Sequence, residues 1–157
     1  MPVHRMSLKG PWDYEWIEFH SRENSAIDFE QSGRVKMPMN WDTHFGDING
    51  TIRFLRRFHQ PTNLDPDEQV WIVFDGVGGR GFAWMNGHKL GPLKTSAQQQ
   101  RFEITEYLQP NSEIITELTV PSSENHHMPR GLYAPVALEI VGENVIGNLA
   151  TPPSSSR

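Results

Sequence analysis

The side chains that could act as acids or bases in this chain are 19 aspartate and glutamate residues and seven histidines. A glycosidic bond is hydrolysed between two carboxyl groups, one on each side of the bond. No motif in the sequence pairs one acidic residue with another in this way. Asp65, Asp67 and Glu68 stand beside prolines, a composition that is typical of a solvated turn. We therefore expect no catalytic carboxylate.

Nucleophiles and phosphate loops give no stronger signal. The chain has no cysteine, which excludes thiol nucleophiles and disulfides. Ser122 and Ser123 are not framed by the Gly-x-Ser-x-Gly pattern of a nucleophile elbow. Residues 76–81 are rich in glycine, but they lack the Gly-Lys-Ser/Thr ending of a phosphate loop and no helix pattern follows them. A loop between two strands explains this stretch better.

A metal site is the remaining chemistry that these side chains could support. His126 and His127 are adjacent, but no third ligand is spaced nearby, and a zinc site needs three or four ligands. Asp42, Asp47 and Asp75 fall in expected loops without the Asp-x-Asp-x-Asp run of a calcium loop. A turn cap is favoured over a calcium ligand for these aspartates. We expect no metal and no cofactor.

The elements that must position these side chains are mostly short β-strands closed by turn residues. Seven to nine such strands, in rough count, predict an all-β sandwich or barrel. We expect a short turn over 105–108 and one helical turn over 25–30. The expected strands are 51–59, 70–74, 82–85, 88–90, 101–104, 113–120 and 133–141, with weaker candidates at 16–19 and 33–37.

Turn chemistry is clearest at Asn86-Gly87, which lies between two of the expected strands. Asn-Gly is the strongest local signal for a two-residue hairpin, because both turn positions need a positive φ. Gly91-Pro92 is expected to end that hairpin. Trp71 and Trp84 lie inside apolar runs, so we expect both in the core.

Length, charge and hydrophobicity bound the class of protein. The 157 residues suit one domain, which we place at 1–150 with a disordered Pro/Ser-rich tail at 151–157. The net charge is −5 and no basic block stands out, which argues against nucleic acid as a partner. No apolar run approaches the ~20 residues that span a bilayer. Residues 1–9 lack a signal-peptide pattern, so a cytoplasmic location is expected unless the sequence was trimmed.

Several motifs resemble one family when they are read in order. Leu8 to Trp12 resembles the opening of the sugar-binding domain of glycoside hydrolase family 2, which includes β-galactosidases and β-glucuronidases. Val35 to Trp41 is similar to that domain's Val-Pro-x-x-Trp element. Phe74 to Val77 and Ala83 to Gly91 resemble its F-x-G-V … A-x-V-x-x-N-G-x-x-x-G signature. Gly131 to Val136 resembles its Gly-Leu-Tyr-x-x-Val strand.

The resemblance implies a jelly-roll β-sandwich of the galactose-binding-like type, over roughly Leu8 to Val141. Two features depart from the family: Asn111 is followed by Ser112-Glu113 rather than directly by an apolar strand, and residues 126–128 match no family element. The family's catalytic acids lie in a separate (β/α)8 barrel that this sequence does not contain. The resemblance therefore implies a non-catalytic domain.

Sugar binding requires an aromatic face for the C–H side of the ring and planar polar groups for the hydroxyls. The candidates that fall in expected loops are Trp41, His44, Arg130 and Tyr133. We expect a carbohydrate-binding module that uses these residues. A protein-interaction or structural domain that has lost sugar binding is the alternative, and an unrecognised hydrolase ranks third. The expected partner is a carbohydrate or a glycoside hydrolase subunit.

Overall fold

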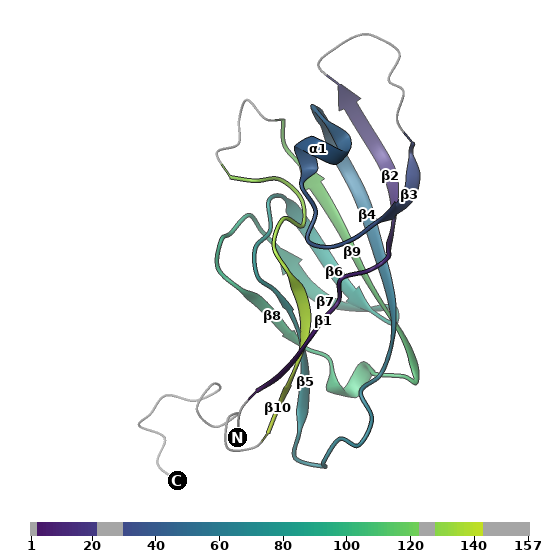
Figure 1. Cartoon of the computed structure of the whole chain (residues 1–157), viewed down its shortest axis with the longest axis vertical. Helices are drawn as coiled ribbons and strands as arrows, with labels where there is room; N and C mark the ends of the chain where they lie inside the picture. The colour runs from purple at the N-terminus through teal and green to yellow at the C-terminus, as the bar shows by residue number, and fades with distance from the viewer. Residues whose placement is uncertain (1–2, 22–29, 123–127, 143–157) are drawn as a thin grey trace.

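The computed structural model describes residues 3–21, 30–122 and 128–142. Their strands form two antiparallel sheets that pack face to face, and Figure 1 shows both running along the length of the molecule. The four-stranded sheet has the order β1 (His4–Ser7), β10 (Val136–Val141), β5 (Gln69–Phe74), β8 (Gln100–Glu103). The six-stranded sheet has the order β3 (Ser32–Val35), β2 (Trp12–Ser21), β4 (Ile48–His59), β9 (Asn111–Val120), β6 (Arg80–Met85), β7 (His88–Leu93). The predicted all-β sandwich is confirmed.

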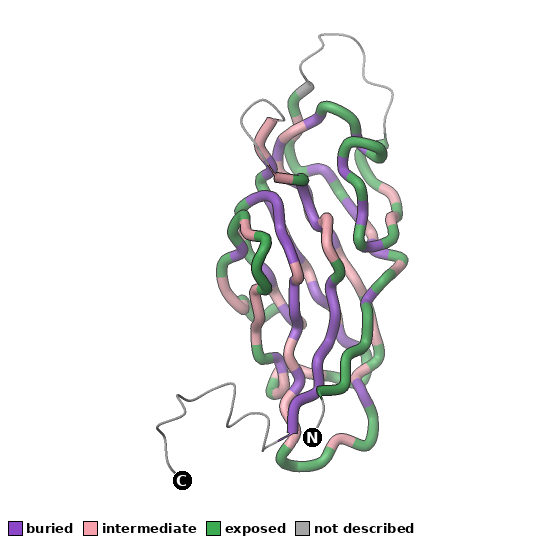
Figure 2. Tube along the Cα trace, turned by 60° about the vertical axis from the view of Figure 1, so that its left-hand side comes forward, coloured by how far each residue is buried: buried purple, intermediate pink, exposed green. Residues whose placement is uncertain are grey.

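Strand alternation in the six-stranded sheet places the core. On β4, Ile52 and Phe54 are fully buried while Arg53 between them lies on the opposite face. On β9, Ile114 and Leu118 alternate in the same way with partly exposed residues. Because successive side chains of a strand point to opposite faces, one face of this sheet meets the core and the other meets solvent. Figure 2 shows the buried segments running along the middle of the sandwich.

Most predicted strands are present with shifted ends. One predicted strand end is wrong, and two elements were not predicted. β7 continues through Gly91-Pro92 to Leu93, so these residues do not end the hairpin. β1 and the helix α1 (Trp41–Phe45) were not predicted. The expected turn after β8 is the 3₁₀ helix η1 (Thr105–Tyr107). The helical turn expected over 25–30, the histidine pair at 126–127 and the tail at 151–157 lie outside the described residues, Glu30 excepted.

The Asn86-Gly87 hairpin turn is confirmed by its backbone. Asn86 has φ 49° and Gly87 has φ 85°, as the positive angles of this turn require. The Asn86 side chain also donates to the carbonyl oxygen of Tyr107 at 2.7 Å, while its Oδ1 accepts from the backbone N–H of Glu113 at 2.8 Å. The asparagine therefore shapes the turn and ties it to β9 and η1.

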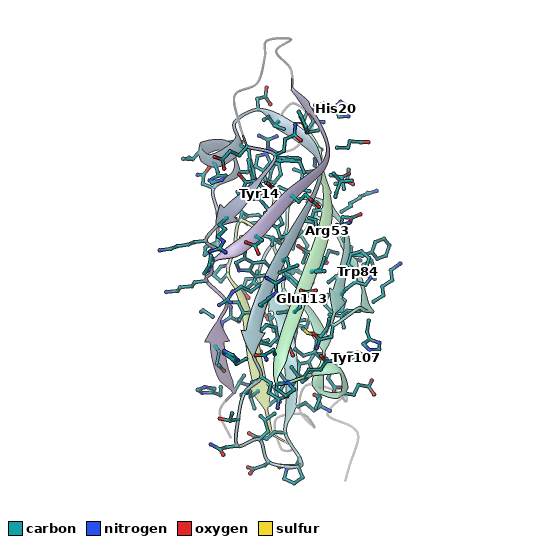
Figure 3. The ribbon with its side chains drawn as sticks, turned by 90° about the vertical axis from the view of Figure 1, so that its right-hand side faces the viewer. Tyr14, His20, Arg53, Trp84, Tyr107 and Glu113 are labelled. Carbon is teal, nitrogen blue, oxygen red and sulfur yellow. The ribbon has the colours of Figure 1, made fainter. Side chains whose placement is uncertain are left out.

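The prediction that Trp71 and Trp84 are core residues is wrong, because both are half-buried and neither belongs to the core cluster. Trp84 lies on the outer face of the six-stranded sheet, beside Phe82 with ring centroids 6.2 Å apart. Figure 3 shows Trp84, Arg53 and Glu113 spread over that face.

The two helices described in the structure have five and three residues, and no described helix is long and apolar enough to cross a membrane.

Candidate functional site

The candidate site is built around α1, at the upper end of the molecule in Figure 1. Asn40 caps this helix: its backbone is extended (φ −93°, ψ 109°) and its Oδ1 accepts from the N–H of Thr43 at 3.0 Å. Gly46 ends the helix with φ 71°, a conformation that favours glycine. Trp41 and Phe45, four residues apart, are the buried side of the helix.

Trp41 is a core residue whose exposed fraction is 2%. Its Nε1 donates to the carbonyl oxygen of Ile48 at 3.0 Å. Its ring packs edge-on against Trp16, with centroids 5.4 Å apart, and against Phe45 at 4.9 Å. A Cβ atom at Gly131 would come within 2.5 Å of Trp41 Cε3, so the glycine makes room for the ring. The flat faces of Trp41 are thus occupied by protein.

Arg130 joins α1 to the segment that leads into β10. Its side chain is 4% exposed and donates to the carbonyl oxygens of Ile48 at 3.3 Å, Gly46 at 3.1 Å and Pro121 at 3.4 Å. It also pairs with the carboxylate of Asp42 at 2.5 Å. A guanidinium with this many fixed acceptors holds several loops in place.

A pocket of about 670 Å³ opens between α1 and the segment that carries Arg130, and we call it the α1 pocket. Three of the four predicted site residues, Trp41, Arg130 and Tyr133, line it. The other lining residues are Pro38, Met39, Asn40, Asp42, Met128 and Pro129. The sequence therefore pointed to groups that do come together.

His44 is the predicted site residue that does not line the pocket. It is exposed, and its ring contacts Phe45 and Tyr14 edge-on at 4.7 and 5.7 Å between centroids. Burial of the Tyr14 hydroxyl raises its pKa above the ordinary value, and the negative charge of the nearby Glu30 carboxylate raises it further by a smaller amount. The expectation that Trp41 and His44 lie in a loop is wrong, because both belong to α1.

Tyr133 offers the aromatic group of the pocket that is half-buried rather than buried. Its ring packs over Gly76, where an added Cβ would come within 2.8 Å of Cζ. Its hydroxyl donates to the carbonyl oxygen of Ser96 at 3.4 Å, a long hydrogen bond. The hydroxyl can therefore be shared with a ligand.

Asn40 and Asp42 are the pocket residues that the sequence prediction passed over. Both are exposed, and the Asp42 side chain keeps 78% of its surface accessible despite its pairing with Arg130. The signal was weak: asparagine is a preferred helix N-cap, but Thr43 three residues later is not the Glu or Gln of a capping box. With Tyr133, these groups provide planar acceptors and donors of the kind that hydroxyl groups need.

Among the residues that the structure describes, one carboxylate lines the α1 pocket, that of Asp42. Acid–base cleavage of a glycoside needs a second carboxyl group across the bond. Within residues 3–21, 30–122 and 128–142, no three His, Asp or Glu side chains gather as metal ligands would. The described side chains of the pocket can thus hold a polar ligand by hydrogen bonds.

Comparison with known proteins gives relatives by sequence. No protein-family profile matches the chain. It is similar to the β-galactosidase of Vibrio cholerae, with 26% identity over 149 residues, which is 79% of this chain and 14% of the relative. It is also similar to the β-galactosidase of Actinobacillus pleuropneumoniae, with 23% identity over 127 residues, covering 69% and 13%. The chain thus spans about one seventh of the length of these relatives.

Solved structures share the fold. An FMN-binding β-glucuronidase from Faecalibacterium prausnitzii L2-6 matches with a TM-score of 0.68 and 17% identity, covering 89% of this chain and 23% of that protein. A glycosyl hydrolase family 2 member from Bacteroides cellulosilyticus matches with a TM-score of 0.67 and 16% identity, covering 88% and 20%. The resemblance read from the sequence is confirmed for the fold.

Proposed function

We propose that this domain binds carbohydrate weakly in the α1 pocket and does not cleave it. Two observations support the proposal. The first is the gathering of Trp41, Arg130 and Tyr133 around one pocket of about 670 Å³, a volume within the ordinary range of small-molecule sites. The second is the shared fold with enzymes that act on glycosides, according to their names. The gathering of these residues carries more weight, because fold alone does not establish function.

The groups around the pocket divide into two roles in this proposal. Tyr133 presents its ring to the C–H face of a sugar, while Asn40 and Asp42 bond to hydroxyl groups. Trp41 and Arg130, already committed to internal hydrogen bonds, fix the position of these groups. A hydrophilic ring offers little apolar area, so we expect millimolar affinity, near −4 kcal/mol.

A titration followed by amide chemical shifts tests the proposal. Galactose and glucuronate, added into the millimolar range, are expected to shift the amides of Asn40, Asp42 and Tyr133 in a saturable way. Asp42→Asn keeps the acceptor for Arg130 but loses the charge, and Tyr133→Leu removes the ring. Both variants should weaken binding while the fold is kept.

The matched control is Asp65→Asn, the same change in an exposed loop after the far end of β4. This variant should bind as the parent does. Equal loss of binding in all three variants, or no saturable shift with either sugar, would remove the α1 pocket as a carbohydrate site.

The alternative, a protein-interaction domain, is supported by the outer face of the six-stranded sheet. Leu55, Ile115 and Trp84 stand in register across β4, β9 and β6, and all three are half-buried. Phe82 beside them is 39% exposed, with Lys89 Nζ 3.7 Å from its ring centroid. An apolar row of this kind suits contact with another protein.

Size-exclusion chromatography with a separately produced family 2 catalytic barrel tests this alternative. Co-elution that is lost in Trp84→Ser would favour a protein-interaction role. Separate elution of parent and barrel at all concentrations would count against it.

A further inference from the structure

A second pocket, of about 540 Å³, opens at the corner where β1 passes the end of β4, and we call it the corner pocket. It exists because β2, which begins at Trp12, does not extend beside the last residues of β4. The last residue pair between β2 and β4 is Asp13 with Leu55, whereas β4 continues with β9 to the pair of His59 with Asn111. Past Leu55, β4 therefore has a strand on one side only among the described elements.

Arg56 occupies an inward position at this corner. Ile52 and Phe54, two and four residues earlier on β4, point to the same side and are fully buried. One Arg56 guanidinium nitrogen, Nη1, donates to the carbonyl oxygen of Arg57, which β2 does not reach. The Nε of Arg56 is buried and has no hydrogen-bond partner.

The charge of Arg56 is not balanced within the part of the chain that the structure describes, where no carboxylate lies within ion-pair distance of it. No aspartate or glutamate lines the corner pocket. Burial without a nearby anion lowers the pKa of the Arg56 guanidinium below its ordinary value. An arginine is still protonated at neutral pH, so the pocket holds an unpaired cation.

The rest of the lining is half apolar and half polar, and its polar residues are Ser7, Arg57, His59 and Asn111. Leu138 on β10 and Leu8, which directly follows β1, are buried, and Phe58 on β4 packs against the core. Met6 on β1 is 36% exposed at the rim. A ligand that uses both the Arg56 cation and the apolar side chains would carry an anion at one end and an apolar body at the other.

We propose that the corner pocket binds an organic carboxylate with a short apolar body, whose carboxylate pairs with the Arg56 guanidinium. A charge-assisted hydrogen bond from the Arg56 guanidinium to the ligand carboxylate would supply the anion that this arginine lacks, while the buried Nε stays enclosed by the protein. The apolar body lies against Leu8, Phe58 and Leu138. A sugar hydroxyl cannot supply the anion, so this site is independent of the α1 pocket.

Hexanoate is the probe that tests the proposal, with hexanamide as its neutral counterpart of the same shape. We expect hexanoate to shift the amides of Ser7, Phe58 and Asn111 in a saturable way, and hexanamide to bind at least about tenfold more weakly. Equal affinity for the two would overturn the proposal. Glucuronate forms a third arm, and stronger binding of this polar acid than of hexanoate would overturn the apolar half of it.

Variants on β4 separate the site from a general charge effect. Arg56→Gln should weaken hexanoate binding about tenfold or more. Arg53→Gln is the matched control, because Arg53 lies on the outer face of the same strand, 2.9 Å from Glu117 and 3.5 Å from Glu15. It should bind as the parent does, and an equal loss in both variants would refute the assignment.

Melting curves accompany each titration. If Arg56→Gln does not fold, Arg56→Lys replaces it: the charge stays, while the Nε–H and the fork are lost. Weaker binding by a folded Arg56→Lys supports the proposal, and unchanged binding would show that a point charge suffices and would overturn the role of the planar guanidinium.

Discussion

Trp41 and Arg130 share one acceptor, the carbonyl oxygen of Ile48, at 3.0 and 3.3 Å. Through it they connect α1, the start of β4 and the segment that leads into β10. A tryptophan ring and a guanidinium that are both nearly inaccessible have the environment of structural groups. Their presence at the α1 pocket therefore explains its shape more than its affinity.

At Trp41, replacement by alanine should lower the free energy of unfolding by about 3–5 kcal/mol, because a buried aromatic ring and an internal hydrogen bond are both lost. Urea denaturation measures this change. Trp84→Ala, a half-buried position on the outer sheet face, serves as the control and should lose clearly less. Similar losses in the two variants would mean that Trp41 is less tightly packed than its 2% exposure indicates.

At Arg130, replacement by lysine keeps the charge but cannot reproduce a fork with acceptors on Ile48, Gly46, Pro121 and Asp42. We expect a loss of roughly 1–3 kcal/mol, the cost of leaving buried acceptors unsatisfied. Arg34→Lys changes a side chain that is 74% exposed and should be nearly neutral. The midpoint of urea unfolding is the measurement, and a neutral Arg130→Lys would contradict the role assigned to the fork.

At the scale of elements, the β6–β7 hairpin depends on two adjacent residues with positive φ. Gly87→Val should cost roughly 1–3 kcal/mol, because a β-branched residue is forced into a disfavoured backbone region. No atom lies within 4 Å of an added Cβ at Gly87, so this cost comes from the backbone rather than from a clash. Gly87→Asn tolerates the angle better and should lose less. Equal melting temperatures for the Val and Asn variants would contradict this explanation.

The same hairpin shows which elements a sequence can predict. Asn86-Gly87 was predictable because turn chemistry is local. α1 was not, because a five-residue helix has little stability of its own and forms here through its Asn40 cap and the burial of Trp41 and Phe45. β1 escaped detection because all four of its residues are exposed and its strand character rests on pairing with β10.

The candidate site was predictable only in part, for a related reason. Trp41, Arg130 and Tyr133 meet because α1 and the approach to β10 lie together in the fold, whereas the sequence only placed them in expected loops. The exposure of tryptophan side chains could not be predicted from the apolar runs around them. Trp71 and Trp84 stand in such runs, yet both are half-buried and lie outside the core cluster. Arg56 gave no signal as a site residue, because the open space beside it depends on where β2 begins.

At the scale of the whole molecule, the two sheets leave open spaces at both ends and on the outer face. Ion pairs cover much of the remaining surface. On the four-stranded sheet, Glu139 accepts from Arg5 at 2.8 Å and from Arg101 at 2.7 Å, which joins β1, β10 and β8. Glu139 is only 8% exposed, so this carboxylate is committed to the sheet and cannot serve a ligand.

The distribution of carboxylates over the pockets leads to the last prediction, that the purified chain does not hydrolyse nitrophenyl glycosides. The α1 pocket is lined by one acid, Asp42, and the corner pocket by none. A third pocket, on the outer sheet face, is lined by one acid, Glu117, which is paired with Arg53. Among the residues that the structure describes, none of these three spaces is therefore lined by the pair of carboxyl groups that glycoside hydrolysis requires on either side of the bond.

Release of nitrophenol from the β-galactoside and β-glucuronide substrates is the measurement, and Asp42→Asn and Glu117→Gln are the informative variants. We expect the parent and both variants to match the buffer rate. A trace activity from a contaminating enzyme would fall on repurification and would be the same in all three proteins. Turnover that persists through repurification and disappears in Asp42→Asn alone would show that a single carboxylate in the α1 pocket recruits a second catalytic group, and the binding-only proposal would then fail.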